Sequence, residues 1–127
     1  MIKSIFSRKE VKYIKSQRIA RIATAAQVEA GLINKSESSS SKIVQPDVVP
    51  VGFHFDGEHF YIGGLDMLRS TKYKNILRNR SIALVIDDLK SINPWRPRGI
   101  RIYGEAEIIK RQGLLWKYMA NLRSCIQ

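Results

Sequence analysis

The chain has 127 residues, a mass of 14.6 kDa and 44% hydrophobic residues, which fits one globular domain and excludes wholesale disorder. Its 22 lysines and arginines outnumber 11 acidic residues, so the net charge of +11 favours an anionic partner. The single cysteine, Cys125, cannot form an internal disulfide, and two histidines do not complete a zinc cluster. The longest apolar run, Ile82 to Ile86, is too short to span a membrane. We therefore expect a cytoplasmic protein without a metal site.

The chain begins with a predicted helix and a predicted strand. Ser7 and Glu10 have the spacing of a capping box, in which each side chain binds the other residue's backbone N–H at a helix start. Residues 18–24 then alternate apolar and basic side chains well enough to indicate a strand. Residues 32–46 contain a serine-rich run that cannot bury a face, so we predict a flexible loop within a hairpin.

A strand–turn–strand pattern follows this loop. Residues 48–55 are rich in β-branched and aromatic side chains, Asp56 and Gly57 supply a turn, and residues 59–63 form the returning strand. Pro50 has no N–H to donate to a strand ladder, so it is expected at a sheet edge, a bulge or a ligand site.

The second half of the chain predicts a helix, two strands and a final helix. Ser70 is placed to cap a helix whose Tyr73, Ile76 and Leu77 share one side. Residues 81–87 are apolar on both faces, as in a central strand, and residues 98–109 alternate cleanly. Apolar residues at helical spacing predict a C-terminal helix over 110–127. The whole chain, 1–127, is thus expected to be one mainly β barrel with appended helices.

Ser70, Thr71 and Lys72 form the first candidate site. A glycine pair leaves a strand before them, and they stand at the positive end of the predicted helix. Free N–H groups, hydroxyls and a cation at a helix start favour a phosphate site. The alternative is an ordinary capped helix with solvated lysines, and the spacing of a Walker loop is absent.

Two further segments are candidates for ligand contact. Val49, Pro50 and Val51 leave backbone that a planar ring could approach, although a bend at a barrel corner explains them equally well. The loop with Trp95, Arg96 and Arg98 could close over an anion or reach a second subunit; alternatively, it is a proline-stiffened connection. No side-chain acid, base or nucleophile stands out, so the catalytic residues are unassigned and a cofactor would have to supply the chemistry.

Four stretches in one order resemble the pyridoxamine 5′-phosphate oxidase-like superfamily of flavin and deazaflavin proteins, most closely its small F-420-dependent class. Together they run from about residue 10 to residue 109, and they are residues 18–24, 46–53, 70–75 with 81–88, and 94–106.

The resemblance implies a six-stranded antiparallel split barrel of the FMN-binding type, which dimerises with cofactor sites at the subunit interface. Val49, Pro50 and Val51 would lie along the ring. Ser70 and Lys72 would match the family's Ser-x-Lys phosphate motif. The partner subunit would contribute the residues Trp95, Arg96 and Arg98. Small members of the family end with a further strand, where the pattern here predicts a helix.

The sequence therefore predicts a homodimeric oxidoreductase that uses FMN, or alternatively the deazaflavin F-420, and transfers hydride to or from a small-molecule substrate. A non-catalytic flavin-binding protein is one alternative. A basic nucleic-acid-binding barrel is another, supported by the net charge, the basic helix at 69–80 and aromatic residues on strands, although nucleic acid is not the expected partner.

Overall fold

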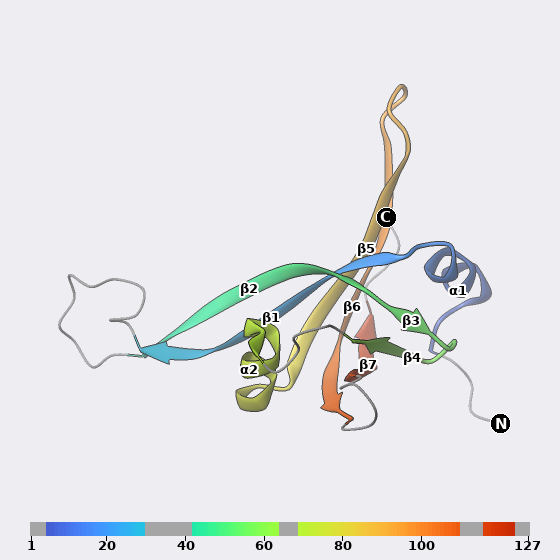
Figure 1. Ribbon diagram of the computed structural model, residues 1–127. Coiled ribbons are helices and arrows are strands. Elements are labelled where there is room, and N and C mark those ends of the chain that lie inside the picture. Colours follow the sequence, from blue (N-terminus) through green and yellow to red (C-terminus); the bar gives the residue numbers. More distant parts are fainter. Residues whose placement is uncertain (1–4, 30–41, 64–68, 110–115, 124–127) are drawn as a thin grey trace.

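The computed structural model describes residues 5–29, 42–63, 69–109 and 116–123 (Figure 1). In chain order the elements are α1 (Arg8–Lys15), β1 (Ile19–Glu29), β2 (Lys42–Gly52), β3 (His54–Phe55), β4 (His59–Ile62), α2 (Thr71–Arg78), β5 (Ser81–Ser91), β6 (Arg96–Ile108) and β7 (Trp116–Arg123). Every strand pair in the described part is antiparallel, which confirms the predicted mainly β class.

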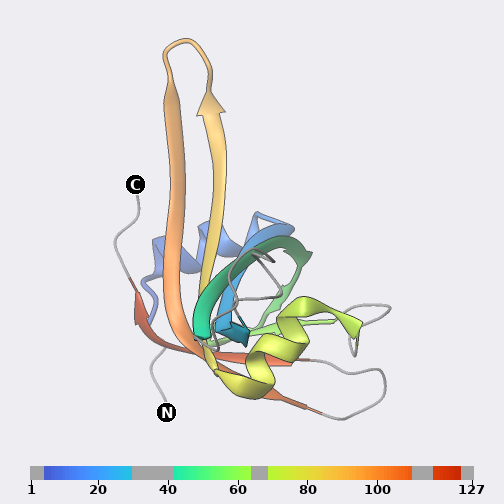
Figure 2. The ribbon, with the colours of Figure 1, turned by 90° about the vertical axis from the view of Figure 1, so that its left-hand side faces the viewer.

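The strands of the described residues form one seven-stranded sheet in the order β2-β1-β5-β6-β7-β4-β3. Its two end strands, β2 and β3, follow one another in the chain with only Phe53 between them. The sheet therefore curls until its ends meet along one bent segment, which makes a barrel of the split type (Figures 1 and 2). β3 adds a short seventh strand to the six expected. β2 pairs only with β1, so Pro50 does lie on an edge strand.

The barrel core is built from alternate residues of the central strands. β5 lies between β1 and β6, as its apolar sequence predicted. On these strands the inward residues are almost fully buried, and they include Ile22, Leu84, Ile86, Ile100 and Ile102. The alternation predicted for β6 is confirmed, because Arg101, Tyr103, Glu105 and Glu107 are exposed.

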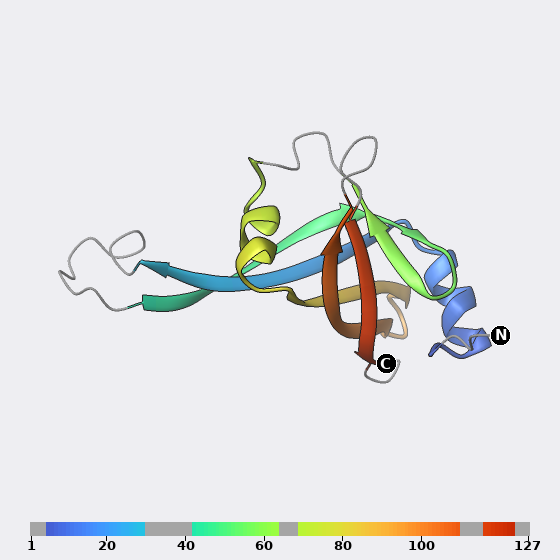
Figure 3. The ribbon, with the colours of Figure 1, turned by 90° about the horizontal axis from the view of Figure 1, so that it is seen from below.

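Helix α1 closes one end of the barrel (Figure 3). The predicted capping box is present: the Glu10 N–H donates to Ser7 Oγ at 3.1 Å, and the Ser7 N–H donates to Glu10 Oε1 at 2.7 Å. Just before this cap, the Phe6 ring meets the Phe55 and Phe60 rings edge-on, with centroids 5.4 and 6.0 Å away. Burial of these rings fixes where the chain enters α1.

Helix α2 packs on β1 through a buried polar contact. The Asn75 side-chain amide donates to Thr24 Oγ1 at 3.0 Å, and both residues are buried. Tyr73 and Ile76 face the core as predicted, whereas Leu77 is 61% exposed. The prediction that Leu77 lies on the buried side of α2 is therefore wrong, and Asn75 lies on that side instead. No helix in the described ranges is long and apolar enough to cross a membrane.

Two sequence predictions are corrected by the sheet. The C-terminal helix expected over 110–127 is wrong, because residues 116–123 form β7, which pairs with β6 on one side and β4 on the other. Backbone hydrogen bonding to two strands outweighs a weak helical spacing. The loop expected over 32–46 is too long, since β2 starts at Lys42 and pairs with β1 along its whole length. The remainder of that loop lies outside the described residues.

The β5–β6 ladder contains one position that only glycine fits. A Cβ added to Gly99 would lie 2.8 Å from the backbone oxygen of Ile86 and 3.0 Å from Asp87 Cβ, neither of which can move freely. Gly99→Ala should therefore lower the free energy of unfolding by about 1–3 kcal/mol.

Thermal melting of the two alanine variants would test this expectation. Gly52→Ala is the matched control, because the nearest atom to its added Cβ is 4.0 Å away. Equal melting temperatures for the two variants would contradict the close approach at Gly99.

Candidate functional site

The start of α2 offers an anion-binding arrangement. Ser70 is the N-cap, and its Oγ accepts from the Tyr73 N–H at 3.2 Å, while the Lys74 N–H donates to the Ser70 carbonyl. The first-turn N–H groups of Thr71 and Lys72 have no partner among the described residues. The first turn contains no acidic residue, so nothing there offsets the positive end of the helix dipole. Residues 64–68, which lead into this turn, lie outside the described part.

The three residues expected to meet a ring lie on edge strand β2, but they face opposite ways. Val51 is buried and Val49 is half-buried against the core, whereas Pro50 is exposed on the outer face. Only the backbone of the two valines can thus meet a ring that lies on the outer side. An edge strand leaves half of its backbone groups unpaired, which suits such a contact.

The outer face of the sheet carries two rows that cross β2, β1, β5 and β6. The ladders align Pro50 with Arg21, Arg21 with Val85, and Val85 with Arg101. A parallel row runs from Val48 through Ala23 and Ala83 to Tyr103. Directly opposed residues of antiparallel strands share a face. Pro50 therefore lies in the same row, on the same face, as Arg21 of β1 and Arg101 of β6. These two rows are mostly apolar, and Arg21 and Arg101 are their two cationic residues.

A cleft of about 610 Å³ lies at the base of the β5–β6 hairpin, and Arg21, Val85 and Arg101 of the outer row are among its lining residues. Its polar lining consists of Arg21, Asp87, Asp88, Arg98 and Arg101, and Trp95 closes one side. The hairpin itself projects away from the barrel (Figures 1 and 2). Its tip is apolar and open, with Ile92 74% and Trp95 66% exposed. The cleft thus combines an aromatic wall with charged side chains.

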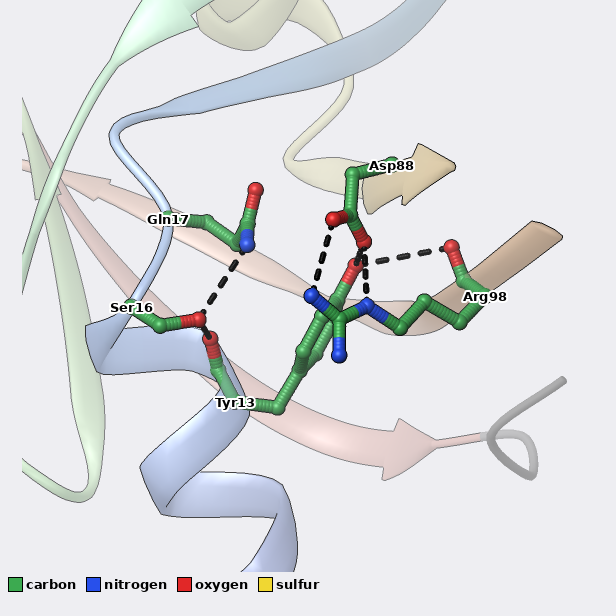
Figure 4. Close-up of polar contacts among 5 residues, drawn as sticks. All are labelled: Tyr13, Ser16, Gln17, Asp88 and Arg98. Carbon is green, nitrogen blue, oxygen red and sulfur yellow. Dashed lines mark hydrogen bonds and ion pairs between the residues drawn. The ribbon is translucent and has the colours of Figure 1, made fainter. Parts of the chain in front are cut away.

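Arg98 is held in the cleft by residues from two other elements (Figure 4). Its Nε and Nη2 donate to the two oxygens of Asp88 at 2.7 and 2.9 Å. The Tyr13 hydroxyl from α1 donates to Asp88 Oδ1 at 2.7 Å. The guanidinium carbon also lies 5.1 Å from the centroid of the Tyr13 ring, within cation–π range.

The charges of this cluster are fixed at neutral pH. The hydrogen bonds from Arg98 and Tyr13 hold the pKa of the Asp88 carboxyl below its usual value, so Asp88 is ionised. Burial, followed by the hydrogen bond to Asp88, raises the pKa of the Tyr13 hydroxyl, so Tyr13 keeps its proton.

The arginines of the cleft are largely matched by carboxylates. Arg21 forms an ion pair with Asp87, as Arg98 does with Asp88. Three arginines and two aspartates leave one net positive charge in the lining. The cleft therefore suits a planar, weakly charged group better than a phosphate.

A single chain gathers only part of the predicted site. Trp95 and Arg98 line the cleft together, and Pro50 adjoins it through its cross-strand partner Arg21, whereas Arg96 does not line it. The Ser70–Lys72 turn stands at the start of α2, before β5, whereas Trp95 follows β5. The 11 residues of β5 extend roughly 33 Å at 3.3 Å per residue. Within one chain, β5 therefore lies between the Ser70–Lys72 turn and Trp95.

Sequence reasoning missed Tyr13, Arg21, Asp87 and Asp88. Two adjacent aspartates at the end of an apolar strand were a usable signal, because carboxylates there need cationic partners. Tyr13 gave no signal, since its contact with Asp88 spans 75 positions. No group of three or more potential metal ligands occurs within the ranges that the structure describes.

Comparisons with known proteins show the family of this chain. Residues 6–126 match the family model described as pyridoxamine 5′-phosphate oxidase. A 5a,11a-dehydrotetracycline/5a,11a-dehydrooxytetracycline reductase of Streptomyces rimosus is 31% identical over 110 residues, which cover 85% of this chain and 67% of that protein.

Solved structures show the same fold at low sequence identity. A FAD-binding protein of Mesorhizobium loti has a TM-score of 0.65 at 14% identity. The match covers 93% of this chain and 90% of the FAD-binding protein's chain. The heme storage protein HutZ of Vibrio cholerae has a TM-score of 0.61 at 12% identity. This match covers 91% of this chain and 90% of the HutZ chain. Because the family model spans nearly the whole sequence, this chain belongs to the pyridoxamine 5′-phosphate oxidase family.

Proposed function

We propose that this protein is an oxidoreductase that binds FMN, or alternatively the deazaflavin F-420, at the seam of a homodimer. Its family, the reductase relative and the FAD-binding neighbour support a flavin-type cofactor. The cofactor would supply hydride transfer, and the protein would supply position and charge.

The observation that carries this proposal is the start of α2. Two unpaired N–H groups, from Thr71 and Lys72, lie beside the Thr71 hydroxyl and the half-buried Lys72 side chain. Ser70 Oγ already caps the helix, so its part is to order this turn. Backbone donors, a hydroxyl and an ammonium group are the set that a phosphate monoester accepts. The residues present therefore fit the phosphate end of the cofactor.

The ring end would lie on the outer face, near Pro50 and the cleft. Weak net charge, an aromatic wall at Trp95 and accessible edge backbone at Val49–Val51 suit a flat heterocycle there. Arg98 would meet the polar edge of the ring, and Arg96 would lie at the rim of the interface.

A second copy of the chain would bring its Trp95 towards the Lys72 turn. The exposed outer face, with Val48 64% exposed, and the open hairpin tip are apolar surfaces of the kind that dimers bury. If the hairpin of one protomer lies over the outer face of its partner, Trp95, Arg96 and Arg98 approach the partner's Pro50 and Lys72 side. Each cofactor would then be held by both protomers.

The reductase relative favours an enzyme, and a small organic acceptor is the proposed substrate class. Turnover of reduced cofactor against a panel of acceptors separates this function from non-catalytic binding. Nucleic-acid binding would instead show an affinity that falls steeply with salt.

Lys72→Ala tests the phosphate assignment. Removal of the ammonium group should weaken FMN or F-420 binding by about tenfold or more, because a charge-assisted contact is lost. Fluorescence titration with each cofactor measures this change, and circular dichroism checks the fold.

Lys74→Ala is the matched control for this variant, because Lys74 is an exposed lysine of the same helix that does not lie in its first two positions. An affinity unchanged in Lys72→Ala, or lowered equally in Lys74→Ala, would show that the phosphate is bound elsewhere.

Val48→Asp tests the proposed homodimer interface. By light scattering, the wild-type protein should have about twice the 14.6 kDa mass of one chain. In Val48→Asp, dimerisation would bury a charged aspartate, so the variant should be monomeric and should lose cofactor binding as well. Leu77→Asp is the control, because Leu77 is similarly exposed but lies on α2. A monomeric wild type that binds the cofactor fully would refute the shared site.

A further inference from the structure

Arg98 is ordered in the cleft before any ligand arrives. Its carboxylate partner Asp88 comes from the neighbouring strand, and its aromatic partner Tyr13 comes from α1, 85 positions earlier in the chain. The side chain of Arg98 is nevertheless 40% exposed, and Arg98 is one of the residues that line the cleft.

The hydrogen bonds determine which edge of the guanidinium remains available. Asp88 takes Nε and Nη2 as a bidentate acceptor, and Nη1 has no partner among the described residues (Figure 4). A guanidinium is a rigid planar fork, so fixing one edge also fixes the direction of the other donors.

Tyr13 restrains the same group from a second direction. Its hydroxyl donates to Asp88 Oδ1, the oxygen that also accepts from Arg98 Nε. Its ring lies against the guanidinium, so rotation of either Asp88 or Arg98 would break a contact with Tyr13. Three elements, α1, β5 and β6, thus define one orientation of Arg98.

We propose that Tyr13 and Asp88 are positioning residues that hold Arg98 with Nη1 free to bind an acceptor atom of the ligand in the cleft. This inference rests on the proposed function, in which that ligand is the ring of a flavin-type cofactor. Carbonyl oxygens and ring nitrogens are the acceptors that such a donor would recognise. Because Asp88 offsets the charge of Arg98, the contact is selective for a polar, weakly charged edge over a phosphate.

Two variants remove the positioning contacts one at a time. Asp88→Asn keeps the shape but releases Arg98, and it should weaken cofactor binding by about tenfold. Tyr13→Phe keeps the ring and removes only the hydroxyl bond, and it should weaken binding by roughly threefold. Fluorescence titration with FMN and with F-420 gives the dissociation constants, and thermal melting reports the fold. If Asp88→Asn does not fold, Tyr13→Phe by itself tests the positioning role.

A double-mutant cycle separates positioning from a structural role. If Asp88 and Tyr13 act through Arg98, then adding either substitution to Arg98→Ala should cause no further loss of affinity. A purely structural effect would instead add to that of Arg98→Ala. The matched control is Tyr61→Phe, which removes a similar tyrosine–aspartate bond, to Asp56, from the β3–β4 hairpin. Its cofactor affinity should equal that of wild type.

Each outcome decides the inference. Wild-type affinity in both Asp88→Asn and Tyr13→Phe, or additive losses in the cycle, would overturn it and leave the proposed function intact. Loss of binding in Tyr61→Phe as large as in Tyr13→Phe would also overturn it. If the wild type binds neither cofactor, the proposed function itself fails, and the positioning inference fails with it.

Discussion

The antiparallel ladder through β1, β5 and β6 is the constraint on which the rest of this structure depends. Its register sends Ile22, Leu84 and Ile102 into the core, and the same register must send their chain neighbours outward. A shift of one residue would exchange the two faces and expose the core. The outer row of Arg21, Val85 and Arg101 is therefore a geometric consequence of core packing, and the candidate site is built on it.

The β5–β6 hairpin turns this constraint into a binding surface. Close packing at Gly99 brings β6 against β5, and the next register position pairs Asp88 with Arg98. Beyond that pair the hairpin leaves the barrel and exposes its apolar tip. The ion pair of Asp88 and Arg98 thus neutralises charge at the base of the hairpin, while Trp95 is exposed near its tip. This division fits a ligand whose ring is weakly charged and whose phosphate is bound elsewhere.

The two candidate binding regions rely on different physics. At the start of α2, unpaired N–H groups and a first turn without acidic residues would attract an anion without any deep pocket. On the outer face, orientation comes from matched ion pairs and packing. Under the proposed function no side-chain acid or base is required, because a flavin-type cofactor would supply the hydride chemistry and the protein would supply binding, orientation and charge.

Local patterns in the sequence determined a large share of the fold. The capping box at Ser7, the Asp56-Gly57 turn, the Ser70 cap and the alternation of β6 depend on residues close in the chain, so the sequence predicted them correctly. The family resemblance supplied the barrel type, whereas the helix predicted over 110–127 departed from the family's final strand and was wrong.

Tertiary structure decided what local pattern could not. The segment over 116–123 became a strand because two partner strands accept its backbone, and Leu77 was exposed because Asn75 binds Thr24 in the core. The Tyr13–Asp88–Arg98 cluster joins residues up to 85 positions apart. Such contacts depend on how the whole sheet curls, and no short stretch of sequence contains that information.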